Sequence, residues 1–405
     1  MEIFFQEIQK NMQMSVNKLI DYFCPSCGED NKEVLYQYRI YKKGSGENLV
    51  TLVICLSCNF IFNSPRPSLK EIYKHYKNDS SGAVYSENSD GSRTFVLNLE
   101  RSEFIEKHCS NLKKGNFLDI GCGQGSLLKK LKIPQLKKHG LDPIHDSSNI
   151  PNDEIIFIGA FIEDYEPDID KKYNAISCIS SLEHYYNPNI FFKKLENLID
   201  LNGVLILEVP DTLRPKIQLA EFFSFEHFSH FTKASLTRML NFYCFDVIEF
   251  DKKVSIPNIR VAAKKIKNTK NTIIQKSEKL LIKETFNTYV KNRKLEIQKL
   301  GSIINPTIAC CKKNKKNILI YGAGYHTMQL FMHFDLEKYV SNYIDGDPKK
   351  WGKIFRGKKI FKPSDIRLIT QSHIIISSHD YEAEILNTIK INNPNSLEVT
   401  CLYNR

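Results

Sequence analysis

Four of the eleven cysteines stand in two closely spaced pairs. The stretch "YFCPSCGED" contains Cys24 and Cys27, and "VICLSCNFIF" contains Cys55 and Cys58, so that two C-x2-C pairs flank 27 residues. A gap of two residues lets both thiolates of a pair reach one ion, and four thiolates close a tetrahedral zinc shell with no position left for water. The pattern therefore predicts a structural Zn2+ site rather than a catalytic one.

The segment between the two pairs has the composition of a β-hairpin. The runs "EVLYQYRIYKK" and "ENLVTLVICLSC" are rich in β-formers and lie on either side of "GSGEN". We therefore expect a zinc ribbon, in which each side of a hairpin carries one cysteine pair. A redox pair is the alternative, but such a pair is expected beside a βαβ pattern, which this segment lacks. Seven further cysteines show no ligand spacing and are expected to be small core residues: Cys109, Cys122, Cys178, Cys244, Cys310, Cys311 and Cys401.

A second stretch, "NFLDIGCGQGSLLKKL", changes from an apolar strand through three glycines to a helix. Gly121, Gly123 and Gly125 permit positive φ and a close approach of the backbone to a ligand. A dinucleotide fingerprint would read G-x-G-x-x-G, whereas here the spacing is G-x-G-x-G with Asp119 two residues before the first glycine. The Asp119 carboxylate would repel a pyrophosphate, and it suits a cation or an amino group.

Another acid follows at the end of the next expected strand. In "HGLDPI", Asp142 stands 23 residues after Asp119. In a doubly wound sheet an acid at such a position accepts hydrogen bonds from ribose hydroxyls. The two acids together favour a nucleoside that carries a positively charged, amino-acid-like tail.

Residues 95–265 resemble the class I S-adenosylmethionine-dependent methyltransferases. The resemblance rests on "LDIGCGQG", Asp142, "YNAISCISSLEHYYNP" and "LIDLNGVLILEVPD", which follow one another in the family's order. It implies that Asp119 and the glycine backbone face the methionine part of S-adenosylmethionine, and that Asp142 faces the ribose. It also implies three residues near the adenine or the mouth of the active site: Phe161, Ile162 and Glu183. The alternative is a nucleotide-binding fold that uses no methyl donor.

Candidate acceptor residues occur in "AEFFSFEHFSHFTKASLTRML", where Glu226, His227 and His230 lie among phenylalanines. A helix is expected to follow, capped by Thr232 or Ser235. A histidine in an apolar setting beside an acid can have its pKa adjusted for general base catalysis. The alternative is a packed loop whose histidines only satisfy backbone groups. The clustering favours a catalytic role, for His227 more than for His230.

The order of the parts resembles the sugar C-methyltransferases that act on nucleotide-linked deoxysugars. That family carries a Glu-His pair after its fifth strand, which maps onto Glu226 and His227 in "FEHFSHFT". The resemblance implies that His227 removes a proton beside a ketone, that Glu226 orients it, and that the enolate attacks the sulfonium methyl. A tyrosine hydroxyl after the zinc ribbon also contributes in that family, and "YKHYKNDSSGAVYSEN" offers Tyr76 or Tyr85.

The C-terminal part is expected to contain a helix and a second α/β unit. Residues 266–312 show apolar positions at spacings of three and four, typical of a helix packed on one face. "KNILIYGAGYHTMQLF" then repeats the strand, glycine turn and helix pattern, but Thr327 stands at the third glycine position, which weakens a pyrophosphate-binding role. The unit resembles the C-terminal domain that helps enclose the nucleotide sugar in the same family. "YGAGYHT" and "IISSHD" depart from that family's usual segments.

These elements predict an α/β protein with a zinc ribbon, a central Rossmann-like methyltransferase domain and a smaller C-terminal Rossmann-like domain. The expected boundaries are 1–75 for the ribbon, 76–265 for the methyltransferase domain, 266–312 for the helical connector and 313–405 for the C-terminal domain. A length of 405 residues suits such a division, since a single core rarely serves so long a chain.

Composition narrows the function classes. Hydrophobic residues make up 42% and charged residues 25%, which is ordinary for a folded protein. No run predicts a membrane span or a secretion signal, so a cytoplasmic protein is expected.

The net charge of +11 could attract nucleic acid. Aromatic residues do not interleave with the lysines, so a solvated surface is favoured over an RNA methyltransferase. O-methylation of a sugar or glycan precursor, and a scaffold that binds nucleotide sugar without catalysis, are further alternatives. The sequence does not indicate the oligomeric state.

Overall fold

The computed structural model of the protein describes residues 20–42, 46–69, 72, 93–143, 155–166, 172–219, 221–269, 274–393 and 397–403. The chain divides into two compact units. Unit 1 comprises Met1–Tyr38, Val50–Pro215 and Phe223–Thr285, and unit 2 comprises Arg39–Leu49, Lys216–Phe222 and Phe286–Arg405. Tyr76 and Tyr85, two predicted catalytic residues, lie outside the described residues.

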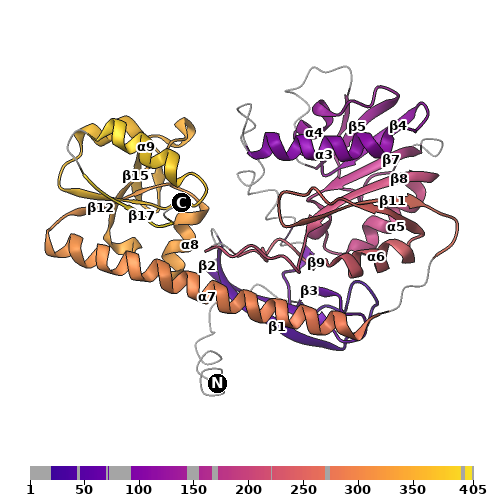
Figure 1. Ribbon diagram of the computed structural model, residues 1–405, viewed down its shortest axis with the longest axis horizontal. Helices are drawn as coiled ribbons and strands as arrows, with labels where there is room; N and C mark the ends of the chain where they lie inside the picture. The colour runs from indigo at the N-terminus through magenta and orange to yellow at the C-terminus, as the bar shows by residue number, and fades with distance from the viewer. Residues whose placement is uncertain are drawn as a thin grey trace. The chain divides into compact units, whose positions relative to one another are not determined.

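Unit 1 contains a seven-stranded sheet with the order β10-β11-β8-β7-β4-β5-β6 (Figure 1). The strands from β8 to β6 in this order run parallel, whereas β11 is antiparallel to β8 and β10 is antiparallel to β11. Chain order reverses between β4 and β7, and ligands bind outside the carboxyl ends of strands at such a point. The strands are β4 (Gly115–Ile120), β5 (Leu136–Leu141), β6 (Ile155–Ile158), β7 (Tyr173–Ile179), β8 (Ile199–Pro210), β10 (Phe245–Phe250) and β11 (Asn258–Lys265).

Helices cover both faces of this sheet, because alternate strand residues point to opposite faces. Phe117 packs in a core with residues of α3 (Arg93–Cys109) and α4 (Ser126–Lys130). Its neighbour Leu118 packs in a different core with residues of α5 (Pro188–Leu198) and α6 (Lys233–Phe242). The near-continuous apolar strands are therefore explained by burial on both sides.

The start of α6 confirms the cap expected from the sequence. The Thr232 hydroxyl accepts from the backbone N–H of Ser235 at 3.0 Å, and the Ser235 hydroxyl accepts from the backbone N–H of Thr232 at 2.9 Å. This reciprocal capping box satisfies two backbone donors that the helix itself leaves unpaired. The helix therefore begins directly after the loop that carries the candidate acceptor residues.

The second sheet has four strands in the order β1-β2-β3-β9. The expected hairpin is formed by β1 (Lys32–Lys42) and β2 (Gly46–Cys55). Two shorter strands follow, β3 (Ile61–Asn63) and β9 (Ser229–His230), which pair antiparallel through Ile61 with His230 and Phe62 with Ser229. The cysteine-containing segment is thereby joined to the segment that directly follows Glu226 and His227.

Unit 2 contains a six-stranded sheet in the order β14-β15-β13-β12-β16-β17. All neighbouring pairs are parallel except β14 with β15. The strands are β12 (Asn317–Tyr321), β13 (Val340–Ile344), β14 (Ile354–Phe355), β15 (Lys358–Phe361), β16 (Ser372–Ile376) and β17 (Glu398–Cys401). The helices are α8 (Tyr325–His333) and α9 (Glu382–Asn392), with 3-10 turns η3 (Glu337–Tyr339), η4 (Pro348–Lys350) and η5 (Pro363–Leu368).

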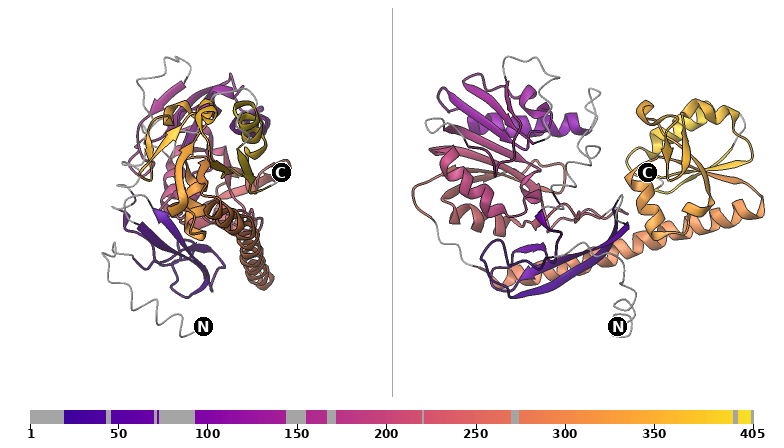
Figure 2. Two further views of the ribbon diagram at one scale, coloured as in Figure 1. Left: turned by 90° about the vertical axis from the view of Figure 1, so that its left-hand side faces the viewer. Right: turned by 180° about the vertical axis from the view of Figure 1, so that it is seen from behind.

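The helix expected in the connector is observed as α7 (Lys276–Lys313), which is continuous in Figures 1 and 2. Its buried positions Ile282, Phe286 and Tyr289 follow the spacing of four and three that the sequence shows. Within the described part of the chain, no helix is both long enough and apolar enough to cross a membrane.

Candidate active site and cysteine cluster

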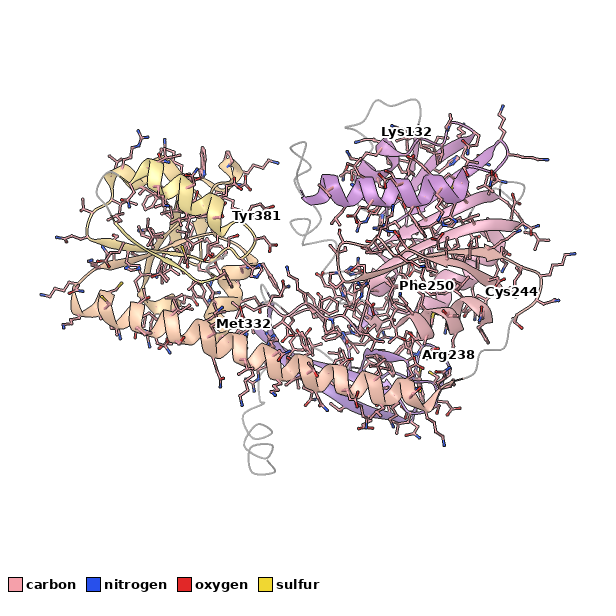
Figure 3. All side chains as sticks on the ribbon, viewed as in Figure 1. Lys132, Arg238, Cys244, Phe250, Met332 and Tyr381 are labelled. Atoms are coloured by element: carbon pink, nitrogen blue, oxygen red, sulfur yellow. The ribbon has the colours of Figure 1, made fainter. Side chains whose placement is uncertain are left out.

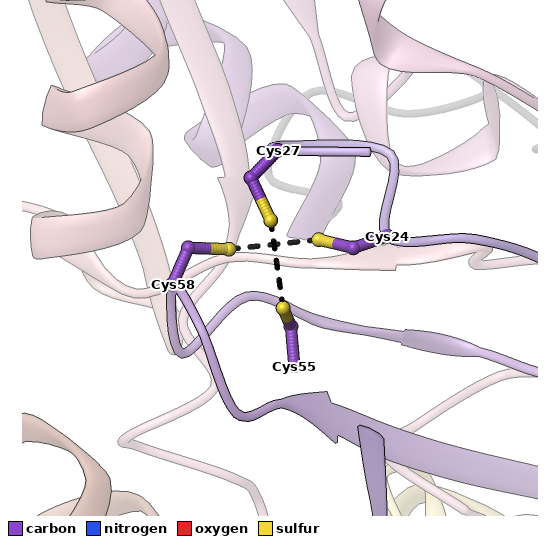
Figure 4. A group of neighbouring side chains, drawn as sticks. All are labelled: Cys24, Cys27, Cys55 and Cys58. Carbon is purple, nitrogen blue, oxygen red and sulfur yellow. Dashed lines mark hydrogen bonds between the residues drawn. The ribbon is translucent and has the colours of Figure 1, made fainter. Parts of the chain in front are cut away.

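The four predicted zinc ligands converge in unit 1 (Figure 4). Their sulfur atoms all lie within 4.8 Å of one another. The Sγ atoms of Cys24 and Cys58 are 3.5 Å apart, as are those of Cys27 and Cys55. A tetrahedral shell with Zn–S bonds of about 2.3 Å separates its sulfurs by roughly 3.8 Å. The four thiols therefore fit a single Zn2+ ion.

Local backbone geometry places each cysteine pair. After Cys24 the chain turns through Gly28 at φ 80°, and after Cys55 it turns through Asn59 at φ 59°, a left-handed conformation that glycine and asparagine tolerate. The Cys58 carbonyl accepts a 2.8 Å hydrogen bond from Arg238 of α6, which also pairs with Glu278 of α7. Arg238 is labelled in Figure 3. The cluster is thus anchored to helix α6 as well as to the hairpin.

The predicted donor loop forms a left-handed turn after β4. Gly121, Gly123 and Gly125 have φ of 76°, 53° and 73°. A Cβ on Gly121 would lie 2.4 Å from the Ser181 hydroxyl, whereas one on Gly123 would meet nothing within 4 Å. Gly121 is therefore required by packing, and the space beside Gly123 can admit a ligand. The Asp142 carboxylate accepts the Gly123 N–H at 2.8 Å, so the two predicted acids flank this turn.

Asp119 is buried at the carboxyl end of β4, where it accepts a 2.5 Å hydrogen bond from the Ser177 hydroxyl of β7. Burial raises the pKa of Asp119 to about 7, against the opposing effect of the Ser177 hydrogen bond, and the nearby charge of Asp142 adds to the increase. A positively charged ligand stabilises the ionised form of a carboxyl group with this pKa, so Asp119 is suited to bind a cation.

We expect the affinity for S-adenosylmethionine to rise, by up to about tenfold per pH unit, as the pH increases through the Asp119 pKa of about 7. Below this pKa the carboxyl group is protonated and no longer attracts the ligand's ammonium group. Calorimetry across this range would test the prediction. Asp119→Asn should bind more weakly above pH 7 and lose the dependence. The same dependence in that variant would assign it to another group.

The other predicted cofactor residues lie near the same edge of the sheet. Phe161 is half-buried and Ile162 is buried in the turn after β6. Glu183 is buried in the 3-10 turn η2 (Leu182–His184) after β7. Burial raises the Glu183 pKa to about 8, and its Oε2 atom has no hydrogen-bond partner among the described residues. Such a buried and unpartnered carboxyl oxygen favours a binding role for Glu183 over a purely structural one.

Glu183, His184 and His227 form a compact cluster, in which one ligand atom from each residue lies within 4.8 Å of the others. The His184 and His227 rings meet edge to face with centroids 4.7 Å apart. Burial lowers the pKa of both histidines, so both imidazoles are neutral near pH 7. The set of two imidazoles and one carboxylate could also hold a divalent cation.

Glu226 acts on a histidine that the sequence did not suggest. Its charge raises the pKa of His184, against the larger effect of burial, whereas the groups that shift the His227 pKa are His184 and His230 after burial itself. The adjacent pair Glu226 and His227 therefore contributes to one cluster with His184, rather than acting as an isolated acid-base pair.

His230 is more enclosed than His227. It lies in β9, its Nε2 atom is 3.0 Å from the Asn63 side-chain oxygen, and burial lowers its pKa to about 3. The Asn63 side-chain amide also donates to the His227 carbonyl at 2.8 Å. A residue of the cysteine-containing sheet therefore holds both histidines, which favours a positioning role for His230.

Replacing Asn63 by Ala is expected to lower the free energy of unfolding by about 1–3 kcal/mol, because a buried histidine and a carbonyl would lose their partner. Acceptor turnover should also fall, while S-adenosylmethionine affinity stays unchanged. Chemical denaturation and initial rates would measure the two effects. Asn116→Ala, which removes a hydrogen bond to the Lys172 carbonyl instead, is the matched control. Equal effects of the two variants would contradict the assignment.

Sequence reasoning missed Ser177, His184, Asn63 and Arg101. Arg101 binds the buried Glu208 and lowers the pKa of Glu183 against the larger effect of burial. Only His184 carried a local signal, since "LEH" repeats the Glu-His pair of "FEH". The other three act through partners that are distant in the sequence, so no spacing could have revealed them.

The left-handed glycine turn, flanked by two acids, lies at the chain-reversal point, where ligands bind in a doubly wound sheet. Residues 97–249 match the family model of a methyltransferase domain, and residues 314–396 match the model named C2185-like, N-terminal. Residues 97–249 are therefore a methyltransferase domain of the class that uses S-adenosylmethionine.

Two curated relatives are ubiquinone biosynthesis O-methyltransferases. That of Rickettsia conorii is 30% identical over 134 residues, which cover 31% of this chain and 44% of the relative. That of Chromobacterium violaceum is 25% identical over 114 residues, which cover 26% and 49%. The chain thus spans less than half the length of these relatives.

One similar solved structure is the 1,6-didemethyltoxoflavin-N1-methyltransferase of Burkholderia thailandensis with bound S-adenosylhomocysteine. The TM-score is 0.41 at 13% identity, covering 56% of this chain and 99% of that one.

Proposed function

We propose that the protein transfers a methyl group from S-adenosylmethionine to a nucleotide-activated sugar, at the carbon beside a keto group. The observation that carries the proposal is the pairing of β3 with β9. Through this pairing the cysteine-containing sheet is continuous with the loop of Glu226 and His227. Two of the features that resemble the sugar C-methyltransferases, the cysteine-containing hairpin and the Glu-His segment, are therefore neighbours, which supports the proposal. We further propose that the four cysteines hold a structural Zn2+ ion.

His227 is the proposed base. Its imidazole takes the proton from the carbon beside the ketone, and the electron pair of the broken C–H bond forms an enolate. The enolate carbon then attacks the sulfonium methyl, so that a C–C bond forms as the C–S bond breaks. The products are the methylated sugar, S-adenosylhomocysteine and a protonated imidazole. The Glu183 carboxyl group lies in one cluster with His184 and His227, and a positive charge formed there would lower its pKa of about 8, so that the ionised carboxylate would stabilise the imidazolium.

Proximity supplies much of the expected rate, because holding acceptor and donor in line replaces a bimolecular encounter. The carboxyl end of β4 carries the donor turn, and the segment after the adjacent β7 carries Glu183 and His184. The donor and the acceptor groups thus belong to neighbouring strand ends.

Mass spectrometry would test the function with the purified protein, S-adenosylmethionine and a panel of nucleotide-linked keto and hydroxy sugars, run in ordinary and in heavy water. Addition of one methyl group to a keto sugar, with deuterium entering the adjacent carbon, is the expected result. A methylated product without this exchange would refute the enolate route, and no methylated sugar at all would refute the proposed acceptor.

O-methylation is the second candidate, favoured by the Glu183, His184 and His227 cluster. A divalent cation bound there would lower the pKa of an acceptor hydroxyl, as metal ions do for bound water. His227 would then be a ligand instead of a base. Activity that requires added Mg2+ or Mn2+, in protein whose cysteine cluster retains its zinc, would favour this candidate. Activity without such an ion would favour the first.

A further inference from the structure

Arg66 is a buried cation close to the histidine cluster. Its side chain is 1% exposed. Its backbone is held by two hydrogen bonds to Ile20, of 2.9 and 3.0 Å. The guanidinium carbon lies 3.4 Å from the centroid of the Tyr22 ring, 4.1 Å from that of Tyr186 and 5.5 Å from that of Phe228. The charge is therefore surrounded by aromatic rings.

No described residue accepts a hydrogen bond of good geometry from this guanidinium, although the Tyr22 and Tyr186 side chains act on it as weak acceptors that raise its pKa against the larger effect of burial. Nε, Nη1 and Nη2 are all buried without a partner. A guanidinium has five N–H donors, and an aromatic ring attracts the charge without replacing their directed bonds to oxygen. Burial lowers the Arg66 pKa, and among the charges that act on it no carboxylate occurs. The group thus bears the cost of a desolvated cation to which the described residues supply no counter-charge.

The other buried arginines of the described chain pair with carboxylates. Arg260 donates at 2.7 Å to Glu208 and at 2.7 Å to Asp251. Arg293 pairs with Glu221 at 2.9 Å. Where a buried arginine serves the fold, this chain supplies a carboxylate. Among the described residues no carboxylate plays this part for Arg66, and an anionic ligand can.

The rings around Arg66 connect it to the proposed acceptor site. Tyr186 follows His184 by two residues, and Phe228 directly follows His227. The Phe228 N–H donates to the Glu183 carbonyl at 2.8 Å, and the Tyr186 and Phe228 rings are in edge contact at 5.5 Å. An anion bound by Arg66 would therefore lie next to the segments that carry the candidate catalytic groups.

We infer that Arg66 is an oxyanion-binding residue of the acceptor site, which receives a phosphate group of the acceptor. The inference rests on the proposed function, because a nucleotide-linked sugar carries a diphosphate. The planar fork of arginine matches two oxygens of a phosphate or a carboxylate, so these two sources share the same chemistry. The aromatic neighbours hold the fork in place and reduce the entropy lost on binding.

Calorimetry with inorganic pyrophosphate and with a nucleoside diphosphate, each in the presence of S-adenosylhomocysteine, would test the site. We expect Arg66→Met to weaken both affinities by roughly 10- to 100-fold, as expected for loss of charge-assisted hydrogen bonds. Arg66→Lys keeps the charge but loses the planar fork, so its affinity for each probe should lie between that of the wild type and that of Arg66→Met. Unchanged affinity in Arg66→Met, or no binding of any probe by the wild-type protein, would overturn the inference. Binding of malonate in place of the phosphates would assign a carboxylate as the source.

Thermal stability separates binding from a structural role. If Arg66 has no counter-charge in the fold, Arg66→Met should melt at the same temperature as wild type or higher, since removing a buried unpaired charge is not costly. Arg238→Met is the control, because Arg238 pairs with Glu278 at 2.7 Å. It should melt at a lower temperature and bind pyrophosphate normally. A marked drop in the melting temperature of Arg66→Met with normal pyrophosphate binding would make Arg66 structural.

The binding experiment is independent of methyl transfer. If no nucleotide sugar is methylated but pyrophosphate binding depends on Arg66, the proposed acceptor is wrong and the oxyanion site stands. If a nucleotide sugar is methylated and its KM is the same in Arg66→Met, the proposed function stands and the oxyanion site is wrong.

Discussion

Replacing His227 by Asn is expected to reduce acceptor turnover by roughly two to four orders of magnitude, the usual contribution of a general base. Asn keeps the size and polarity of the side chain but cannot take up the proton. Binding of S-adenosylmethionine should be unchanged, because the donor turn and Asp119 are untouched. Initial rates and calorimetry on the same preparation would measure both quantities.

His108→Asn is the matched control for this variant. His108 lies in α3, where its Nε2 atom is 3.3 Å from the Glu249 carboxylate, and it is not part of the histidine cluster. Its replacement should leave turnover within about threefold of wild type, as is usual for a residue that touches none of the reacting groups. Near-normal turnover in His227→Asn would remove His227 from the mechanism. Loss of S-adenosylmethionine binding in that variant would instead point to a folding defect.

Replacing Cys55 by Ser is expected to abolish zinc binding and to lower the melting temperature by roughly 10 °C or more. Structural zinc contributes folding free energy directly, and each kcal/mol shifts the melting temperature of a domain of this size by about 2–4 °C. Turnover should fall as well, because β3 and Asn63 connect the cysteine-containing sheet to His227 and His230. Metal analysis, thermal melting and initial rates would test the three parts.

Cys310→Ser provides the control, since Cys310 is exposed in α7 and lies outside the four-cysteine cluster. It should retain one zinc ion per chain and wild-type stability. A Cys55→Ser variant that stays folded and active would show that the metal has no structural role. Loss of zinc from Cys310→Ser would show that the ligand set is different from Cys24, Cys27, Cys55 and Cys58.

Features encoded by neighbouring residues were predictable. The two C-x2-C pairs indicated a cluster whose four sulfurs do converge, although zinc itself stays a proposal. The three glycines indicated a turn whose φ angles are all positive, and Thr232 indicated the start of α6. Each depends on residues within a few positions of one another, where side-chain size and hydrogen-bonding capacity decide the backbone conformation.

The roles assigned by resemblance were only partly predictable. The expectation that Glu226 acts on His227 stays a prediction, and the charge of Glu226 also acts on His184, which reaches the site from the 3-10 turn after β7. His230 was a catalytic candidate, and its ring is held by Asn63. A residue type and its neighbour therefore indicated the right region, but not the partner of each group.

The sequence by itself determined which segments form the donor turn, the cysteine cluster and the capped helix, because local backbone preferences and side-chain period are written in consecutive residues. Only the tertiary structure decided that Ser177 pairs with Asp119 across 58 positions and that Asn63 holds His230 across 167. It also left Arg66 buried without a carboxylate partner among the described residues. The physical reason is that pKa values and unmet hydrogen bonds depend on burial and on neighbours in space, which packing brings together from distant parts of the chain.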